Sequence, residues 1–452
     1  MPKTVEQLPV LELPWDNVMA GELPTMLAQM ATEQGPIFQV PVDDADEANI
    51  FMVGPEANRF VLHTHREHFS HDKGWTPIIG DDFGHGLLNM DDPEHARHRK
   101  MWNPAFTSAC MEAYVPLMQA VIADRARRWP ERGVVDMQDE SRQITFGVAA
   151  TVLAGFHSGV EVDRLRELFY TMLHGFDEAR DNWDSYAARA AAARGELVRT
   201  LLQLIARRRA MPLADSPRDV LSVIVHARDE DGEPLTDVQV LAHLNILLVA
   251  GHETTTTLGG WVLYRLATQP KLWQRVQAEV ARGTQEDGTI TAETLRGLRL
   301  LDMVIRETGR LNSPVINVPR GVVSPFEFGG YQIPAGRQVR LGLAASHRLP
   351  SVWREPERFD PERFAPPREE DKRQPYALVT FGGGPRVCIG INFAQIEVKA
   401  LVAHVIQHYD LATASDQMPI HTGWWTAEVP GGIPMRVTGR TTVGDEREVA
   451  RP

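Results

Sequence analysis

The ten residues FGGGPRVCIG, from Phe381 to Gly390, decide the fold of this chain. Four of them are glycines, which allow the backbone to approach a flat, bulky group without a Cβ clash. The following residues, 391–408, carry apolar side chains at helical spacing, so Cys388 lies just before a predicted helix. The dipole and the unpaired N–H groups at the start of a helix stabilise a thiolate. We therefore treat Cys388 as a candidate functional thiolate.

The cysteine content limits what such a thiolate can do. Cys110 is the only other cysteine, which excludes a disulfide framework and favours a reducing, cytoplasmic compartment. Zinc and iron–sulfur sites need several Cys or His ligands close together, and the Cys388 loop offers one. An axial thiolate on haem iron requires a single cysteine. On the residues alone, a haem ligand and a buried small hydrophobic side chain are both open.

The loop resembles the haem-binding loop of the cytochrome P450 family, F-G-x-G-x-R/H-x-C-x-G, at every fixed position. The resemblance implies haem b with Cys388 as the single protein ligand to iron, and cofactor contacts from Phe381, Arg386 and Gly390. It also implies the family's fold, which is mainly α with a minor β component and has a long central helix over the haem. We expect a single domain over residues 1–452, ending in a polar tail at 441–452.

The segment AGHETT, residues 250–255, lies in a long apolar run that follows Thr236, a predicted helix N-cap. Its glycine and threonines favour a kink or a widened turn. The segment is similar to the family's A/G-G-x-D/E-T-T motif. That resemblance implies that Ala250 borders the haem, that Thr254 steers protons to O2 and that Glu253 relays them from solvent. Without the resemblance, a structural ion pair for Glu253 is equally plausible.

Two charged residues at helical spacing match a second motif of the family. Glu307 and Arg310 stand at i and i+3, close enough to pair on one helix face, and match E-x-x-R. Arg363, in the segment PERF, matches the family's third partner. The resemblance implies that these three residues form a structural network beneath the haem loop.

A third set of residues is implied to hold the haem propionates. His95 and Arg99 lie one helical turn apart and match the family's H-x-x-x-R, whereas their alternative role is a solvated basic face. Arg320 lies where the family often supplies another partner, and Arg386 would complete the set. Four donors for two carboxylates are a reasonable match in charge and hydrogen bonding.

The substrate pocket is expected to be apolar, with one polar residue that would orient a substrate oxygen. The expected lining residues, of which Asn317 is the polar one, are Phe83, Leu87, His243, Leu247, Val315, Asn317, Trp424 and Trp425. The formal net charge of -13 argues against nucleic-acid binding. We see no apolar stretch long enough to span a membrane, and we expect a monomer.

The resemblance implies a monooxygenase that inserts one oxygen atom from O2 into a hydrophobic small molecule, by hydroxylation or epoxidation. The residues after 408 are too few for a flavin reductase domain. Electrons are therefore expected from NAD(P)H through a separate ferredoxin or flavodoxin with its reductase. Two alternatives are a peroxide-driven peroxygenase, against which Glu253 and Thr254 argue, and a non-catalytic haem-thiolate sensor.

Apolar periodicity and turn residues predict the remaining elements. These are two short strands within 36–54, helices over 94–129 and 161–209 and up to about Leu311, a strand pair within 326–345, and a final hairpin over 420–437.

Overall fold

The computed structural model describes residues 2–41, 48–156, 159–173 and 183–440. The expected polar tail at 441–452 and part of the expected helix over 161–209 lie outside these ranges. The chain divides into two compact units, which are described separately. The first unit combines Met1–Phe69, Ile122–Ile144 and Thr254–Pro452, and the second combines Ser70–Val121 and Thr145–Glu253. The expectation of a single domain stays a prediction.

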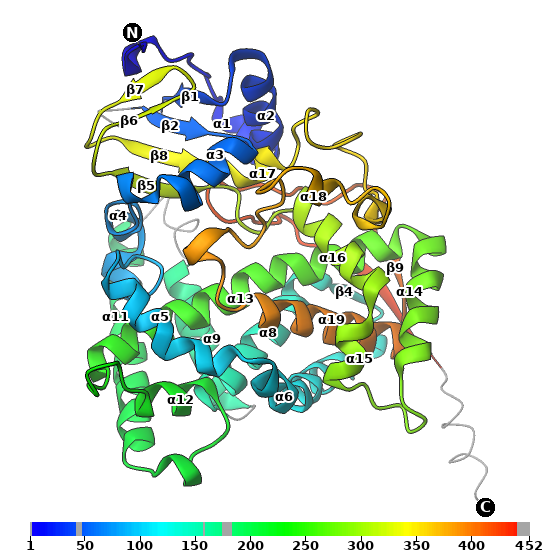
Figure 1. Cartoon of the computed structure of the whole chain (residues 1–452). Helices are drawn as coiled ribbons and strands as arrows, with labels where there is room; N and C mark the ends of the chain where they lie inside the picture. Colours follow the sequence, from blue (N-terminus) through cyan, green and yellow to red (C-terminus); the bar gives the residue numbers. More distant parts are fainter. Residues whose placement is uncertain (1, 42–47, 157–158, 174–182, 441–452) are drawn as a thin grey trace, which may run out of the picture. The chain divides into compact units, whose positions relative to one another are not determined.

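The main sheet of the first unit joins segments from opposite ends of the sequence. Strand β2 (Asn49–Met52) pairs antiparallel with β1 (Ile37–Val40) and parallel with β8 (Gln338–Leu341). The other edge of β8 pairs antiparallel with β5 (Val318–Val322). Figure 1 shows the blue strands β1 and β2 beside the yellow strand β8. The two strands expected within 36–54 are therefore confirmed, and their nearly continuous apolar runs reflect burial on both faces.

The strand pair expected within 326–345 is also present. Strands β6 (Phe326–Phe328) and β7 (Tyr331–Ile333) pair antiparallel around Gly329 and Gly330. These two glycines have φ values of 58° and 83°, and a two-residue hairpin turn of type I′ requires positive φ at both positions.

The chain end forms a sheet that differs from the expected hairpin over 420–437. Strand β10 (Pro434–Gly439) pairs with β9 (Tyr409–Thr413) and with β4 (Val134–Asp136), not with the residues just before it. Residues 420–433 form two isolated bridges, Thr422 with Glu428 and Thr426 with the distant Val315. The glycines at 423, 431 and 432 all have positive φ, which is typical of turns, but turn residues do not determine which distant strand a segment joins.

Helices make up most of both units. Those of the first unit are α1 (Trp15–Met19), α2 (Leu23–Gln34), α3 (Pro55–Arg59), α7 (Trp129–Arg132), α14 (Pro270–Gly283), α15 (Ala292–Gly297), α16 (Arg299–Leu311), α17 (Leu343–Ser346), α18 (Glu370–Arg373) and α19 (Ile391–His408). Those of the second unit are α4 (Asp72–Phe83), α5 (Glu94–Trp102), α9 (Val160–Leu173), α11 (Trp183–Arg209) and α12 (Val220–His226). The residues of α6 (Ser108–Ala126), α8 (Met137–Ala154) and α13 (Asp237–Ala267) are shared between the two units.

Helix α13 begins and ends close to the predicted positions. Thr236 caps it, because the Thr236 Oγ1 accepts from the Gln239 N–H at 3.3 Å while the Gln239 Oε1 accepts from the Thr236 N–H at 2.9 Å. The helix is α-helical throughout residues 237–267, so the expected widened turn at 250–255 does not occur. Thr145 Oγ1 donates to the His252 carbonyl at 3.2 Å, which adds a side-chain donor beside this stretch of helix.

Among the described residues, no single helix combines the length and the apolar character needed to cross a membrane. One bent pair, Glu94–Phe106 with Ser108–Arg132, meets both criteria only when its two helices are taken together.

Replacing the cap of α13 tests how much it contributes to stability. We expect Thr236→Ala to lower the free energy of unfolding by about 0.5–2 kcal/mol, because the Gln239 N–H loses its partner. The urea midpoint measures the change. Thr236→Ser keeps the hydroxyl and should stay near the parent midpoint; equal losses in both variants would contradict the cap.

Candidate haem site

The loop that carries Cys388 is folded by its own backbone. The Cys388 N–H donates to the Phe381 carbonyl at 2.9 Å, and the Val387 N–H donates to the Gly384 carbonyl at 3.1 Å. Gly390 then acts as the N-cap of α19. The Cys388 side chain is exposed, so its sulfur lies on an accessible surface two residues before a helix N-terminus. This position favours a thiolate.

Two glycines of the loop are required by its geometry. Gly384 has a φ of 62°, and a Cβ there would lie 2.2 Å from the Leu62 carbonyl oxygen. Gly382 has a φ of 70°, a conformation that residues with a Cβ rarely adopt. A Cβ on Gly390 would lie 4.0 Å from the Cys388 sulfur. The glycines therefore allow the tight loop and keep the sulfur accessible on that side.

Just before the loop, the chain is attached to the core through His347 and Gly309. The Val379 N–H donates to His347 Nε2 at 3.0 Å, and the Gly382 N–H donates to the Val379 carbonyl at 2.8 Å. Thr380 Oγ1 donates to the Gly309 carbonyl on α16 at 3.3 Å. Burial and the nearby arginines lower the pKa of His347 to about 3, so its ring is neutral and can accept this bond.

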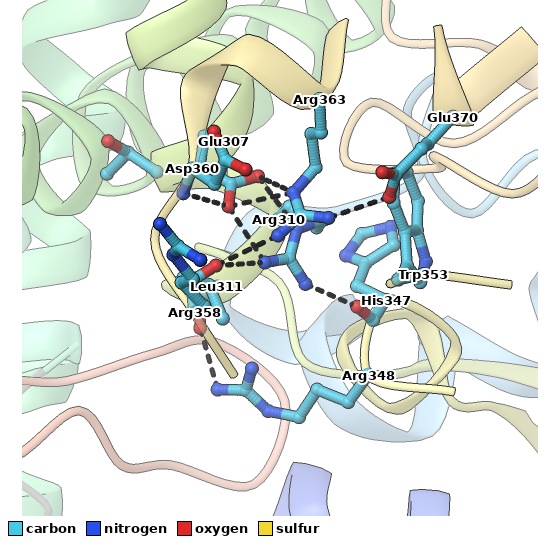
Figure 2. A network of polar contacts seen from close by, with 12 residues as sticks. Glu307, Arg310, Leu311, His347, Arg348, Trp353, Arg358, Asp360, Arg363 and Glu370 are labelled. Carbon is cyan, nitrogen blue, oxygen red and sulfur yellow. Dashed lines mark hydrogen bonds and ion pairs between the residues drawn. The ribbon is translucent and has the colours of Figure 1, made fainter. Parts of the chain in front are cut away.

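Glu307, Arg310 and Arg363 come together in a fully buried network (Figure 2). Arg310 donates to both oxygens of Glu307, from Nε at 2.8 Å and from Nη2 at 2.9 Å. Arg363 Nε donates to the same carboxylate, at 3.0 Å from each oxygen. The Asp360 N–H adds a fourth donor at 2.8 Å. A carboxylate with donors of this number and charge is held in one orientation.

The network has a fourth charged member that sequence patterns missed. Glu370, which is also buried, accepts from Arg363 Nη1 at 2.7 Å and from Arg368. It balances the second arginine, because Glu307 alone would leave two buried guanidiniums against one carboxylate. Only the buried cation at position 363 could have signalled a missing acid. Arg310 Nη1 also donates to the His347 carbonyl at 2.8 Å, which connects the network to the segment before Cys388.

On α13, the expected proton-relay residue Glu253 has a neighbour that the sequence analysis did not select. His252 Nδ1 lies 2.6 Å from the Leu248 carbonyl oxygen, which can only accept, so Nδ1 carries a hydrogen. His252 Nε2 lies 2.9 Å from Glu253 Oε1. His252 is therefore placed to hold the Glu253 carboxyl group in one orientation.

The expected haem-facing residues of α13 are less covered than their neighbours. Ala250 is exposed, and Leu247 and Thr254 are partly exposed. Leu248 and His252, on the adjacent face, are buried, with Phe146 packed edge-on against His252 at 5.0 Å between ring centroids.

The four expected propionate partners are divided between the two units. His95 and Arg99 lie one turn apart on α5 in the second unit, where His95 Nδ1 is 3.4 Å from Asp92 and Arg99 Nε donates to Asn103. In the first unit, Arg320 lies on β5 and Arg386 lies in the Cys388 loop. Their contacts with propionates stay predictions.

The expected pocket residues of the first unit lie side by side. The Ile316 N–H donates to the Trp425 carbonyl at 2.8 Å, and Asn317 Nδ2 donates to the Trp424 carbonyl at 2.6 Å. Val315 also forms a backbone bridge with Thr426. The two segments predicted to line the pocket are thus held together by hydrogen bonds, and Asn317, the expected polar residue, is fully buried between them and its neighbours.

In the second unit, His243 is more constrained than a pocket residue needs to be. The Leu87 N–H donates to His243 Nδ1 at 3.3 Å, so Nε2 carries the hydrogen and donates to His98 Nδ1 at 2.8 Å. Burial lowers the pKa of His243 to about 3, which keeps it neutral. Phe83 is buried at the end of α4, and Leu87 and Leu247 are partly exposed. Substrate contact by these four residues stays a prediction.

The family model for cytochrome P450 matches residues 8–429. The chain belongs to the cytochrome P450 family. Its members are haem-thiolate monooxygenases, and the expected fold, mainly α with a minor β component, is confirmed.

Individual relatives agree with this assignment. Putative cytochrome P450 136 of Mycobacterium tuberculosis is 31% identical over 414 residues, which cover 89% of this chain and 81% of that protein. A sterol 14alpha-demethylase of Mycolicibacterium vanbaalenii is 28% identical, over 82% of this chain and 83% of the relative. The structure of cyanobacterial CYP120A1 with retinoic acid bound superimposes with a TM-score of 0.82. The two sequences are 26% identical, and the match covers 97% of this chain and 100% of that one. The cytochrome P450DA haem domain, at 23% identity with a TM-score of 0.85 and coverage of 96% and 97%, shows the same fold.

The residues of this cytochrome P450 fit the haem that its family implies. An accessible Cys388 thiol before a helix, in a loop whose glycines leave space beside the sulfur, supplies one soft anionic ligand. Among the described residues, no cluster of three or more His, Cys, Asp or Glu side chains is arranged to hold a metal. A site with a single protein ligand agrees with both observations.

In this cytochrome P450, Glu307→Gln should be strongly destabilising. The amide removes the charge shared by Arg310 and Arg363, and breaking a buried pair in this way costs about 3–5 kcal/mol. We expect a large fall in the urea midpoint and a low yield of haem-loaded protein.

Glu362→Gln is the matched control, because it breaks the exposed pair with Arg275 and should cost about 1 kcal/mol or less. Similar midpoints for the two variants would show that the buried network does not stabilise the fold.

Proposed function

We propose that this cytochrome P450 inserts one oxygen atom from O2 into a hydrophobic small molecule, with Cys388 as the axial ligand of haem b. The observation that carries the proposal is the accessible Cys388 thiol before α19, in a loop connected to the buried Glu307 network. When bound, the haem supplies the oxygen-activating chemistry, which the thiolate favours. The chain holds the cofactor, orients the substrate and delivers protons.

The cofactor is assigned to one loop and four basic or donor residues. Phe381 and Gly390 border the sulfur along the chain, and their loop geometry supports a close approach to a flat group. His95, Arg99, Arg320 and Arg386 are assigned to the propionates, because cationic donors are the natural partners of two carboxylates. Ala250, exposed on α13, has no bulky side chain that would block the cofactor.

Proton delivery is assigned to Glu253 and Thr254. His252 contacts the Glu253 carboxyl group, and the Thr254 hydroxyl is the next side chain along α13. A hydroxyl can accept one proton while donating another, which suits it to pass a proton onward. His252 orients the Glu253 carboxyl group through its own bond to Leu248.

The substrate is assigned to the apolar class. Val315, Trp424 and Trp425 are partly exposed on two segments that are hydrogen-bonded to each other, whereas the polar Asn317 is buried beside them. A similar structure holds retinoic acid, a largely apolar molecule, which supports this class. We propose that electrons come from NAD(P)H through a separate ferredoxin or flavodoxin and its reductase, because the family implies redox partners.

The carbon monoxide spectrum tests the ligand directly. We expect the reduced, haem-loaded protein with carbon monoxide to show the red-shifted Soret band of a thiolate complex, and Cys388→Ala to lose it. Cys110→Ala, which changes a cysteine on α6, should keep the band. Its absence from the parent protein, or its persistence in Cys388→Ala, would overturn the assignment.

Removing the Thr254 hydroxyl should uncouple the reaction. Thr254→Ala is expected to bind haem and substrate but to lower product per NAD(P)H about tenfold or more, with the electrons recovered as hydrogen peroxide, because a positioned proton donor is lost. Thr254→Ser keeps the hydroxyl and should retain coupling. Well-coupled turnover by Thr254→Ala would contradict the proton-delivery role.

A further inference from the structure

Arg340 lies beside Asn317, Trp424 and Trp425, three of the residues assigned to the substrate, and matches no sequence motif. It is on β8, opposite Phe51 of β2 and Pro319 of β5. Its Nε donates to Asn49 Oδ1 at 2.8 Å, and its Nη1 lies 3.4 Å from Asn317 Oδ1. The expected polar pocket residue, Asn317, is therefore a direct neighbour of this guanidinium.

Two tryptophans flank the guanidinium. The Arg340 Cζ lies 5.6 Å from the ring centroid of Trp424 and 5.4 Å from that of Trp425. Asn317 fixes this arrangement, because its Nδ2 donates to the Trp424 carbonyl while its Oδ1 faces Arg340. Cation–π contacts of this kind stabilise the cation but leave its charge in place.

Arg340 has no acidic partner among the described residues. None of their carboxylates lies within ion-pair distance of it, and both of its hydrogen-bond acceptors are neutral amides. Burial alone lowers the pKa of Arg340 to about 10, with no carboxylate to offset it, so the side chain is still cationic at neutral pH. A guanidinium has five N–H groups, and two hydrogen bonds leave donors for another acceptor.

The two fully buried arginines of the Glu307 network are compensated from within the protein. Arg310 and Arg363 bind Glu307. Arg265, whose pKa is lowered mainly by burial, binds the amide of Asn312 and lies in the last turn of α13, where the helix dipole favours a cation. Arg340 lies on a strand and has neither form of compensation.

The Arg340 nitrogens are not sealed from solvent. Nη2 makes no hydrogen bond to the described residues, and it is not among the fully buried atoms without a partner. This nitrogen is therefore not fully buried. The Trp425 Nε1 does belong to that group. The guanidinium thus keeps one donor that is not fully buried, beside two aromatic faces and Asn317.

We propose that Arg340 binds a carboxylate on an otherwise apolar substrate, with Trp424 and Trp425 packing against the adjoining hydrocarbon. The inference rests on the proposed function and specifies its substrate class as an apolar carboxylic acid. A carboxylate matches the planar donors of a guanidinium better than a neutral oxygen does, and the tryptophans limit screening by water. Asn49 and Asn317 hold the guanidinium in place without neutralising it.

Calorimetric titration of the haem-loaded protein tests the proposal with defined ligands. The probes are lauric, palmitic and abietic acids, each compared with the alcohol of the same carbon skeleton. We expect at least one acid to bind about 10- to 100-fold more tightly than its alcohol, the range typical of a charge-assisted hydrogen-bonded pair. Arg340→Met should abolish this preference while leaving the affinity for the alcohol unchanged, and Arg340→Lys should keep part of it.

Arg337→Met is the matched control. Arg337 directly precedes β8 and carries the same charge as Arg340. Three residues of extended chain separate the two, so their side chains are expected on opposite faces, and Arg337 lies near Glu6. The preference for the acid should survive in this variant. Unchanged alcohol binding by Arg340→Met shows that the pocket is intact, so the comparison does not depend on fold stability.

Three results would overturn the inference. They are equal affinity of the parent protein for every acid and its alcohol, failure of every acid to bind, and an acid preference that persists in Arg340→Met. These results are distinguishable from failure of the proposed function, because the carbon monoxide spectrum reports on the Cys388 ligand and not on the substrate.

Discussion

The buried carboxylate of Glu307 is the constraint on which the site depends. It holds Arg310 on its own helix and Arg363 from a distant segment, and every one of these groups is fully buried. Because an unpaired charge in that position is costly, the segment around 354–363 must stay packed against α16. Arg310 donates to the His347 carbonyl, and the ring of His347 accepts a hydrogen bond from the Val379 N–H, just before the Cys388 loop. An ion pair thus helps to position a sulfur that it never touches.

Motifs and periodicity predicted those parts of the molecule that are specified locally. Residues 391–408 form a helix with the predicted ends, and Thr236 caps α13 as its sequence indicates. Glu307 and Arg310 could be paired because three residues of helix bring them to one face. Non-local pairings were less accessible. Strand β10 pairs with β9 and β4 rather than with the residues just before it. Its buried residues Met435 and Val437 lie beside strands that are distant in the sequence, and no turn residue identifies those strands.

The missed polar residues have a common physical cause. Glu370, His252 and Arg340 belong to no pattern with a fixed spacing, and each acquires its role from what folding places beside it. Glu370 matters because it binds the buried Arg363. His252 matters because its contact with the Leu248 carbonyl fixes the ring that lies against the Glu253 carboxyl group. A sequence shows which side chains can ionise. Only the fold shows which of them lack, or share, a proton or a counter-charge.

The same principle separates two kinds of arginine in this cytochrome P450. Arg363 is enclosed by Glu307 and Glu370, so its charge is matched inside the protein and it has no need of a ligand. Arg340 is held by neutral amides and aromatic faces, which orient a guanidinium without matching its charge. Burying such a charge without a counter-ion costs free energy in the ligand-free protein, and the attraction to a bound anion offsets that cost. The attraction is larger for a carboxylate than for a neutral hydroxyl. The arrangement therefore favours an acid over the matching alcohol, although the apolar groups around it would bind both.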